Sequence, residues 1–509
     1  MTDSRPVRVR FAPSPTGGLH LGGVRTVLYN YLFARQHNGT FVLRIEDTDQ
    51  TRFVTGAEEY ILNCLEWCGL SPDESVAKPG LYGPYRQSER KSDYWQYADL
   101  LIESGHAYYA FDTPEELDAM RETFKTADNP SPQYDRHTRM QMRNSLSLGA
   151  EATQTLLDDG TPYVVRVKMP SSGTVAFNDA VRGEVRFDLA LVDDKVLLKR
   201  DGMPTYHLAV VVDDYLMEIT HAFRGEEWLP SAPVHVFLWE ALGWNAQMPQ
   251  WAHLPLILGP DGAKLSKRHG AKYGFPIFAM NWTDPKTGEP TEGFRERGFL
   301  PEAFLNSLAL LGWNDGSGDE IFTLPELIAK FSLDRVAASG AVFDYEKAKW
   351  VNQQHLLKLS DADLVANVKP FLETSGLQAS DADLLKVLPV IKERCHLLSD
   401  FYEQCRFFFQ APEAPDADAL RAKWTDKAAA FFESYATVLE AQPTLTESEA
   451  AAGFEAALAA AGIKKGEAML PLRVMLVGGK FGPDLFFILS HIGGPEAAAR
   501  IRTVRNLLS

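Results

Sequence analysis

The sequence predicts an α/β protein that has a parallel-sheet core, a mixed α+β insertion and an all-helical C-terminal region. Three observations lead to this fold class. A strand, a glycine-rich loop, a helix and a second strand follow one another near the N-terminus; short strands alternate with turns between residues 107 and 203; and after about residue 343 the pattern is helical, with no convincing strand. The 509 residues suffice for about three or four domains, and a hydrophobic content of 45% is ordinary for a globular protein.

The N-terminal segment predicts a strand–helix–strand unit. Residues 7–11 alternate in polarity as a strand does, and apolar residues at helical spacing predict a helix over 24–36. Residues 41–45 predict a second strand, which runs into an acidic segment, Glu-Asp-Thr-Asp. Such a unit implies a parallel sheet with a right-handed crossover. Since ligands bind parallel sheets at the carboxyl ends of the strands, we expect the loop at residues 16–23, TGGLHLGG, and the acidic segment to share one edge of the sheet.

The insertion predicts mixed structure. Residues 113–124 have a helical pattern, and three short strands are expected at residues 163–169, 185–189 and 195–198.

The second half of the core is less clear in the sequence. Residues 205–228 are rich in apolar residues and fit either helix or strand. Residues 253–259, HLPLILG, predict one buried strand. A Pro-Asp-Gly turn follows, and then residues 264–268, KLSKR.

Composition excludes several classes of protein. The N-terminal segment lacks the apolar stretch of a secretory signal, and no membrane span is expected. A net charge of −17 argues against nonspecific coating of nucleic acid. It does not exclude a nucleic-acid partner that binds to a local basic face. Cys64 and Cys68 lie four residues apart and fit two buried small hydrophobic residues better than a metal or redox pair. Four cysteines without such a pair fit a reducing cytoplasm.

The loop TGGLHLGG places His20 among four glycines. Glycine lets a ligand approach the backbone, and a helix N-terminus offers free N–H groups to phosphate. The loop matches neither of the common phosphate-binding glycine motifs. Taken alone, His20 fits a structural role in capping or packing at least as well as it fits a role in binding a ligand.

The segment KLSKR contains three cations and one hydroxyl within five residues on a turn. Such a cluster can bind a polyphosphate. Taken alone, it also fits a solvated surface cluster.

Together, the two segments resemble the two signature motifs of the class I aminoacyl-tRNA synthetases, whose usual forms are HIGH and KMSKS; here they read HLGG and KLSKR. RFAPSPTG, LRIEDTDQTR, YRQSER, PTYHLAVVVDD, FRGEEWLPSAP and KLSKRHGA further resemble the bacterial glutamyl branch of that class. The helical C-terminal part resembles its anticodon-binding region, most clearly in GPDLFFILSHIGG, so the resemblance covers essentially the whole chain.

The resemblance implies a reaction and its ligands. Glutamate would attack the α-phosphate of ATP to give glutamyl-adenylate, and tRNA(Glu) would then accept the acyl group on its terminal adenosine. ATP with Mg²⁺ is expected as a substrate complex. The implied catalytic residues are His20, Lys264 and Lys267, because charge stabilisation and alignment suffice for this displacement. The implied ATP-binding residues are His20, Gly22, Gly23, Lys264, Ser266, Lys267 and Arg268.

The resemblance also implies a glutamate pocket. Arg224 can bind the side-chain carboxylate in bidentate fashion, whereas glutamine would leave donors facing donors. Glu46 suits the α-ammonium group. Two structural alternatives stay open: Arg224 in an ion pair with Glu226 or Glu227, and Tyr206 as a core aromatic residue. The motif positions in this pocket are Arg10, Ala12, Ser14, Glu46, Tyr206 and Arg224.

Three positions depart from the family pattern. Gly23 replaces the second histidine of the first motif, and Val210 stands where some members have asparagine. Ala110 and Asp112 replace the cysteines with which many bacterial members hold zinc, so no protein-bound zinc or other metal site is expected. Packing around Phe111 is expected to take the place of that metal.

The implied organisation is a Rossmann-type catalytic core in two halves, at residues 1–106 and 204–345. An acceptor-end-binding insertion lies at 107–203, the second half includes a stem-contact region with the KLSKR loop, and a helical anticodon-binding domain lies at 346–509. We expect a cytoplasmic monomer. Two rival functions are a shortened paralogue that modifies a tRNA base, which lacks the helical domain, and a non-catalytic tRNA- or nucleotide-binding relative. Charging of tRNA(Gln) in addition to tRNA(Glu) stays open.

Overall fold

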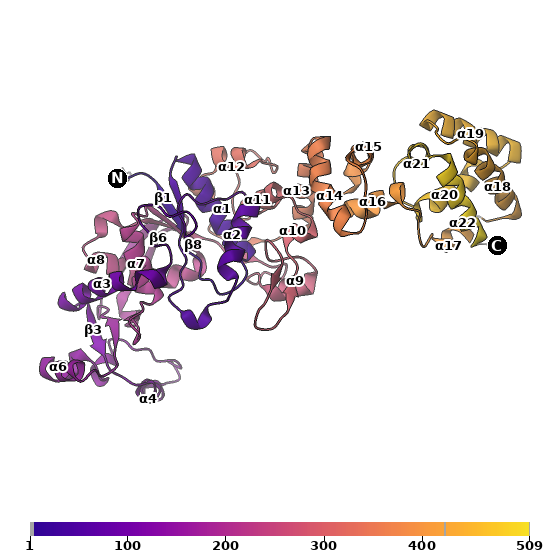
Figure 1. Ribbon diagram of the computed structural model, residues 1–509. Coiled ribbons are helices and arrows are strands. Elements are labelled where there is room, and N and C mark those ends of the chain that lie inside the picture. Colours follow the sequence, from indigo (N-terminus) through magenta and orange to yellow (C-terminus); the bar gives the residue numbers. More distant parts are fainter. Residues whose placement is uncertain (1–4, 422–423, 508–509) are drawn as a thin grey trace. The chain divides into compact units, whose positions relative to one another are not determined.

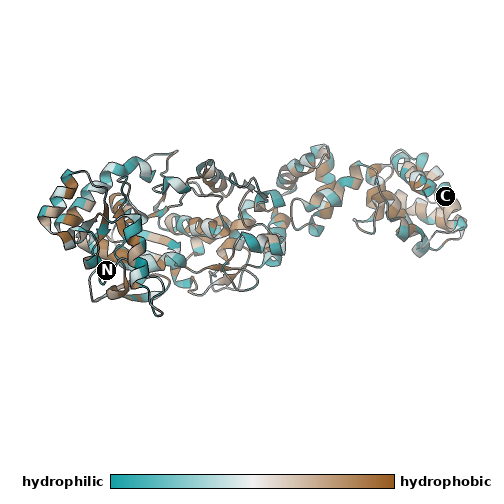
Figure 2. Cartoon of the chain, turned by 90° about the horizontal axis from the view of Figure 1, so that it is seen from below, coloured by the Kyte–Doolittle hydropathy of each residue, from teal (hydrophilic) through white to brown (hydrophobic). Residues whose placement is uncertain are grey.

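The computed structural model describes residues 5–421 and 424–507 (Figure 1). The chain forms two compact units. Unit 1 contains the residues up to 296 together with Pro301–Tyr345, and unit 2 contains Arg297–Leu300 and the residues from Glu346 onward. In Figure 2 many helices carry a hydrophobic and a hydrophilic side, as expected of helices that cover a core.

The centre of unit 1 is a four-stranded parallel sheet, which confirms the predicted fold class. The strand order is β2-β1-β8-β9, so the first strand lies inside the sheet and adjoins a strand that follows it by some two hundred residues. Because the strands are parallel, their carboxyl ends meet at one edge. The strands are β1 (Arg8–Phe11), β2 (Thr40–Leu43), β8 (His221–Gly225) and β9 (Gln250–Leu254).

Helix α1 (Leu21–Gln36) joins β1 to β2, as the sequence predicts. It begins at Leu21, three residues before the predicted start, so Gly22 and Gly23 belong to its first turn. Apolar periodicity did not detect this turn because its glycines have no side chain to show a period.

The ambiguous segment 205–228 contains both kinds of structure. Helix α7 (Tyr206–Leu216) comes first, and β8 follows it. Both elements are largely buried, which explains why their sequence shows no clear amphipathic period.

The single strand predicted at residues 253–259 is wrong. Strand β9 ends at Leu254, and a separate strand, β10 (Ile257–Leu258), begins after Pro255. Strand β10 leaves the main sheet and pairs in parallel with β13 (Ala341–Val342). Proline has no N–H to continue a sheet ladder, so the chain can turn away at this point.

The insertion contains one antiparallel sheet and one hairpin. The sheet has the order β3-β4-β7, and β5 pairs with β6. The strands β3 and β5 are absent from the sequence prediction. The strands β4 and β7 lie within predicted strands, and β6 overlaps the prediction at residues 185–189 but begins at Gly183. Their bounds are β3 (Ala107–Ala110), β4 (Val164–Val167), β5 (Thr174–Asp179), β6 (Gly183–Asp188) and β7 (Val196–Leu198).

The β5–β6 hairpin lies against the main sheet. The backbone N–H of Ala180 donates to the carbonyl of Trp251 in β9 at 2.8 Å, and the ring of Phe177 packs edge-on to that of Trp251. The insertion therefore contributes side chains to the neighbourhood of β9.

The remaining elements of unit 1 are mostly short helices around these sheets. They are α2 (Ala57–Trp67), α3 (Lys91–Glu103), α4 (Pro114–Phe124), α5 (Ser145–Leu148), α6 (Ala150–Asp158), α8 (Ala232–Ala241), α9 (Lys267–Tyr273), α10 (Phe294–Arg297), α11 (Pro301–Ala309), α12 (Leu324–Lys330), β11 (Trp282–Thr283) and β12 (Pro290–Thr291).

Unit 2 is helical, and its described residues contain no strand. Several of its helices begin after a serine or threonine whose hydroxyl accepts from the first turn, for example Ser360 and Thr446. No helix within 5–421 and 424–507 is long and apolar enough to cross a membrane. The helices are α13 (Tyr345–Lys358), α14 (Asp361–Thr374), α15 (Asp381–Ile391), α16 (Asp400–Phe409), α17 (Ala417–Arg421), α18 (Asp426–Glu440), α19 (Glu447–Ala461), α20 (Lys465–Val477), α21 (Leu485–Ile492) and α22 (Gly494–Asn506).

Candidate active site

The structure brings the HLGG and KLSKR segments together around Phe278. The ring of His20 lies 4.5 Å from that of Phe278, measured between centroids, and the ammonium of Lys267 lies 5.4 Å from the centre of the same ring. The first motif also contacts the segment that follows α9, because the N–H of Leu21 donates to the carbonyl of Ile277 at 3.1 Å. Two segments far apart in the sequence therefore meet at one aromatic ring.

The electrostatics of His20 reflect this neighbourhood. Its pKa is lowered from 6.5 to about 4, first by the protein atoms that crowd the ring and then by the positive charges of Lys267 and Lys264. The residue is nevertheless exposed by surface area. His20 is therefore a neutral imidazole at neutral pH, with one N–H to donate.

The KLSKR segment presents its cations to solvent. About half of each lysine side chain is exposed; Lys264 pairs with Glu227 at 3.1 Å, and Lys267 lies 3.7 Å from Asp284. Ser266 precedes α9 and forms a reciprocal cap with His269. Arg268 is exposed at the start of the same helix.

The glycines of the first motif have different physical roles. A Cβ at Gly18 would lie 2.8 Å from Phe278 and Trp282, and one at Gly23 would lie 2.5 Å from Leu19, so both are needed for internal packing. A Cβ at Gly22 would meet no described atom within 4 Å. A Cβ at Gly17 would likewise meet no described atom within 4 Å. Of the two, Gly22 lies in the first turn of α1, where the first N–H groups have no intrahelical acceptor.

Arg224, at the end of β8, is almost completely buried, with 7% of its surface exposed. Its Nε donates to His253 at 3.0 Å, and its Nη1 donates to the Tyr206 hydroxyl at 3.0 Å and to His235 at 3.1 Å. Its Nη2 is buried without a hydrogen-bond partner in the described part of the chain. No ion pair of Arg224 with Glu226 or Glu227 is found there, since Glu226 pairs with Arg182 and Glu227 with Lys264.

This geometry changes the expected binding mode. Nε and both hydrogens of Nη1 are already engaged, so Nη2 is the open edge of Arg224. A carboxylate would meet Nη2 alone unless Tyr206 or His235 released its bond. The bidentate pairing expected from the sequence is therefore not prepared in this structure.

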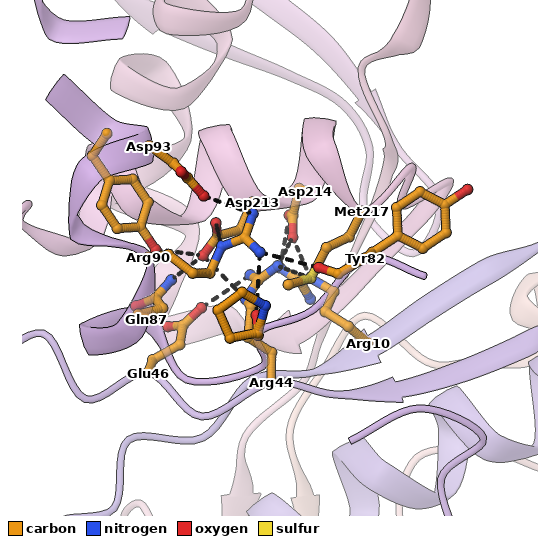
Figure 3. Close-up of polar contacts among 12 residues, drawn as sticks. Arg10, Arg44, Glu46, Tyr82, Gln87, Arg90, Asp93, Asp213, Asp214 and Met217 are labelled. Carbon is orange, nitrogen blue, oxygen red and sulfur yellow. Dashed lines mark hydrogen bonds and ion pairs between the residues drawn. The ribbon is translucent and has the colours of Figure 1, made fainter. Parts of the chain in front are cut away.

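A buried ion network lies beside this pocket (Figure 3). Arg10 donates to both oxygens of Asp214, at 3.0 and 3.2 Å, and to the carbonyl of Phe223. Arg44, which is 0% exposed, contacts Glu46 at 3.0 Å and Asp214 at 2.9 Å. Burial would raise the pKa of Asp214, but Arg10 and Arg44 outweigh it and hold that pKa below its usual value.

The contact with Arg44 does not fully offset the effect of burial on the Glu46 carboxylate. Burial raises the pKa of Glu46 above its usual value, although Arg44 and Arg10 oppose the shift. A cationic group brought to this carboxylate would be stabilised by it.

The other predicted pocket residues lie near Glu46 and Tyr206. The Glu46 N–H donates to the carbonyl of Pro13 at 2.9 Å, which places Ala12 and Ser14 beside it. Tyr206 packs against the Trp228 ring, with 4.6 Å between centroids. Val210, one turn further along α7, is buried.

Sequence reasoning gave no role to several buried polar residues of the site. For Asp213 and Asp214 the sequence did offer a signal, because two adjacent carboxylates follow an apolar run in VVVDD. The two histidines carried no such signal, because an isolated histidine is common in any chain. The missed residues are Arg44, Arg90, Asp179, Asp213, Asp214, His235 and His253.

At the position where zinc was considered, side chains and backbone form a hydrogen-bonded cluster. Asp112 accepts from the Tyr134 hydroxyl at 2.9 Å and from the Arg143 N–H at 2.7 Å, and Asn144 donates to the same hydroxyl at 2.9 Å. Phe111 is buried beside it. Within the described ranges, no group of three or more His, Cys, Asp or Glu residues could hold a metal ion.

The fold and both motifs match known proteins. Residues 6–350 match the family described as tRNA synthetases class I (E and Q), catalytic domain, and residues 363–505 match the anticodon binding domain family. The chain is 50% identical to the glutamate–tRNA ligase of Amoebophilus asiaticus, covering 99% of both chains. It is 51% identical to that of Flavobacterium johnsoniae, covering 98% of this chain and 99% of the relative.

The structural comparison agrees with the sequence comparison. The crystal structure of a glutamate tRNA ligase from Elizabethkingia meningosepticum, in complex with its amino acid, matches with a TM-score of 0.93 and 46% identity. The match covers 99% of this chain and 100% of that one.

The parallel sheet, the two motifs at its carboxyl edge and the helical second unit define a class I aminoacyl-tRNA synthetase, an enzyme class that uses ATP for aminoacylation. Within that class, the chain belongs to the glutamate–tRNA ligase family.

Proposed function

We propose that the motif residues around Phe278 bind the phosphates of ATP and that Arg224 and the residues around it bind the side-chain carboxylate of glutamate. The approach of His20 and Lys267 to a single ring is the observation that carries this proposal. The product would be glutamyl-tRNA(Glu), formed through glutamyl-adenylate.

The residues around Phe278 suit charge stabilisation rather than covalent catalysis. Neutral His20 donates one hydrogen bond to a phosphate oxygen, and Gly22 leaves room for the nucleotide beside the backbone. Lys264 and Lys267 lie at the surface, where they can turn toward the departing pyrophosphate. Ser266 and Arg268 flank Lys267, with Gly23 in the facing helix turn, and complete the proposed ATP set. Mg²⁺ would arrive with ATP and neutralise part of its charge.

The glutamate pocket is proposed to read both ends of the amino acid. Arg224 and Tyr206 face the side-chain carboxylate, and Glu46 attracts the α-ammonium group. Ala12 and Ser14 border the ligand, and Arg10 acts near it while bound to Asp214.

The four-part organisation stated above is proposed for the whole chain. Residues 107–203 would bind the acceptor end of tRNA, residues 204–345 its stem, and the helices after residue 345 its anticodon. We also propose that the enzyme acts in the cytoplasm as a monomer.

The test is aminoacylation with purified tRNA(Glu). Arg224→Ala should lower kcat/KM for glutamate by about 10- to 100-fold, because hydrogen bonds to a charged group are lost. The change should appear mainly in the KM for glutamate, and the KM for ATP should stay within a factor of about two. Arg35→Ala is the control, since Arg35 lies near the end of α1 and pairs with Asp73, where both side chains are partly exposed.

If Arg224→Ala has the wild-type kcat/KM for glutamate, Arg224 does not bind the substrate and its role is structural. Charging that survives removal of the terminal adenosine of tRNA would favour the base-modifying function. Absence of charging in the wild-type enzyme would favour a binding protein.

A further inference from the structure

The arginines of the pocket differ in how their charge is compensated. Arg10 and Arg44 contact carboxylates directly, at Asp214 and Glu46. Arg224 contacts only uncharged acceptors: a tyrosine hydroxyl and two imidazoles. Among the described residues no carboxylate forms an ion pair with Arg224, so its buried positive charge is not neutralised by direct contact with an anion.

The two imidazoles can accept from Arg224 only if they are neutral and in a defined tautomer. The ring of His253 places Nδ1 2.5 Å from the carboxylate of Asp179 and Nε2 3.0 Å from Nε of Arg224. Because the guanidinium only donates, Nε2 must be the acceptor and Nδ1 must hold the proton. Asp179 therefore selects the tautomer that suits Arg224.

His235 works in the same way from another element. Its Nδ1 lies 3.1 Å from Nη1 of Arg224, and its Nε2 lies 3.2 Å from Nδ1 of His207. Nδ1 must accept, so Nε2 carries the proton and donates it to His207. Burial and the charge of Arg224 lower the pKa of His235 well below its ordinary value, which keeps the ring neutral.

Asp179 is fixed by more than His253. It accepts from the backbone N–H groups of Val181 and Arg182, both at 3.0 Å, and from that of His253 at 3.1 Å. Burial would raise the pKa of Asp179, but the hydrogen bond with the His253 ring and the backbone bonds from Val181 and His253 hold that pKa below its usual value. The carboxylate of Asp179 thus stays ionised. The ring of His253 lies between this carboxylate and Arg224, so Asp179 orients His253 without pairing with the guanidinium.

We propose that Asp179, His253 and His235 are positioning residues that hold Arg224 in place while leaving its charge for the ligand, and that they thereby set the preference for a carboxylate over a carboxamide. This inference rests on the proposed function, in which Arg224 binds the side-chain carboxylate of glutamate. A carboxylate in place of either imidazole would neutralise Arg224 and remove the preference.

The first test replaces Asp179 by asparagine. The Asp179→Asn amide would present an N–H to Nδ1 of His253, so the ring would carry its proton on Nε2 and point a donor at Arg224. We expect the KM for glutamate to rise by about 10-fold or more, with kcat changing less and the KM for ATP unchanged. The preference for glutamate over glutamine should fall in parallel. Asp99→Asn, at an exposed position of α3 in the catalytic core, is the control.

The second test compares two variants of His235. His235→Asn keeps an acceptor near the position of Nδ1, whereas His235→Leu removes it. The asparagine variant should retain most of the glutamate affinity that the leucine variant loses. Equal losses in both variants would indicate a packing role and overturn the proposal for His235.

The wild-type enzyme provides a test that does not depend on folding of a variant. Long-range ¹⁵N–¹H NMR of the histidine side chains should show His253 protonated at Nδ1 and bare at Nε2 throughout pH 6–8. A proton on Nε2 of His253 would overturn the inference. If Arg224→Ala impairs glutamate use while Asp179→Asn does not, the inference fails alone; if neither has an effect, the proposed function fails as well.

Discussion

At the scale of single residues, the imidazole of His20 is set apart by its low proton affinity. Its pKa of about 4 arises first from partial burial and then from the charges of Lys267 and Lys264. A histidine that must donate to phosphate gains from this, because it stays in one protonation state throughout the neutral range.

We predict that His20 titrates with a midpoint near 4 in the free enzyme, and that Lys267→Ala moves the midpoint upward but not to 6.5, since partial burial remains. Histidine ¹³C–¹H NMR, assigned with His20→Asn, measures both values. Because the unfolded chain binds the proton more tightly, His20 adds stability as pH rises from about 4 to 6.5. A midpoint near 6.5 in the wild-type enzyme would contradict the proposed neighbourhood.

The sequence could indicate His20, the KLSKR cations and Arg224 because each belongs to a recognisable motif. It could not indicate Asp179, His253 and His235. These residues come from a hairpin of the insertion, a strand and a helix, and only folding brings them to Arg224. The same limit holds for Gly23: the sequence could not show that Leu19 occupies the space beside it, so that any contact of Gly23 with ATP would be made by its backbone.

At the scale of elements, the ion network ties the end of β2 to α7. Arg44 lies just after β2, and its partners Asp213 and Asp214 lie in α7. All three side chains are buried. Removing the arginine that these carboxylates share leaves part of the buried negative charge uncompensated.

We predict that Arg44→Met destabilises unit 1 by about 3–5 kcal/mol, because the buried carboxylate of Glu46 would lose its paired cation. Asp213 and Asp214 would lose their shared cation and keep one arginine each, Arg90 and Arg10. Arg35→Met is the control: Arg35 pairs with Asp73 where both side chains are partly exposed, so its loss should cost about 1 kcal/mol or less. Urea unfolding followed by tryptophan fluorescence compares the two. Equal effects would mean that burial does not decide the strength of these pairs.

Sequence pattern predicted α1 and the strands β1, β2, β4 and β6. It left helix and strand open over the buried elements α7 and β8, and it failed where proline interrupts an apolar run. The segment 253–259 is apolar throughout, but Pro255 divides it between two sheets. The pairing of β10 with β13 depends on residues more than eighty positions away, which local sequence does not reveal.

At the scale of the whole molecule, each of the two units contains its own pair of buried, free cysteines. Cys64 and Cys68 lie in unit 1, and Cys395 and Cys405 lie in unit 2. Burial raises the pKa of Cys64 and of Cys405 to about 12 and raises those of Cys68 and Cys395 as well. Thiolates are therefore scarce in the folded protein, and each pair reports on the core around it.

We predict that the two cysteines of a unit become reactive together, whereas the two pairs become reactive at different urea concentrations, because a unit with its own core opens cooperatively. Pulsed alkylation along a urea gradient, followed by peptide mass spectrometry, resolves the four sites. The untreated enzyme is the control and should show negligible labelling at all four cysteines. Simultaneous labelling of all four would show that the chain unfolds as one cooperative body, and labelling of one cysteine from each unit ahead of its neighbour would contradict the assignment of separate cores.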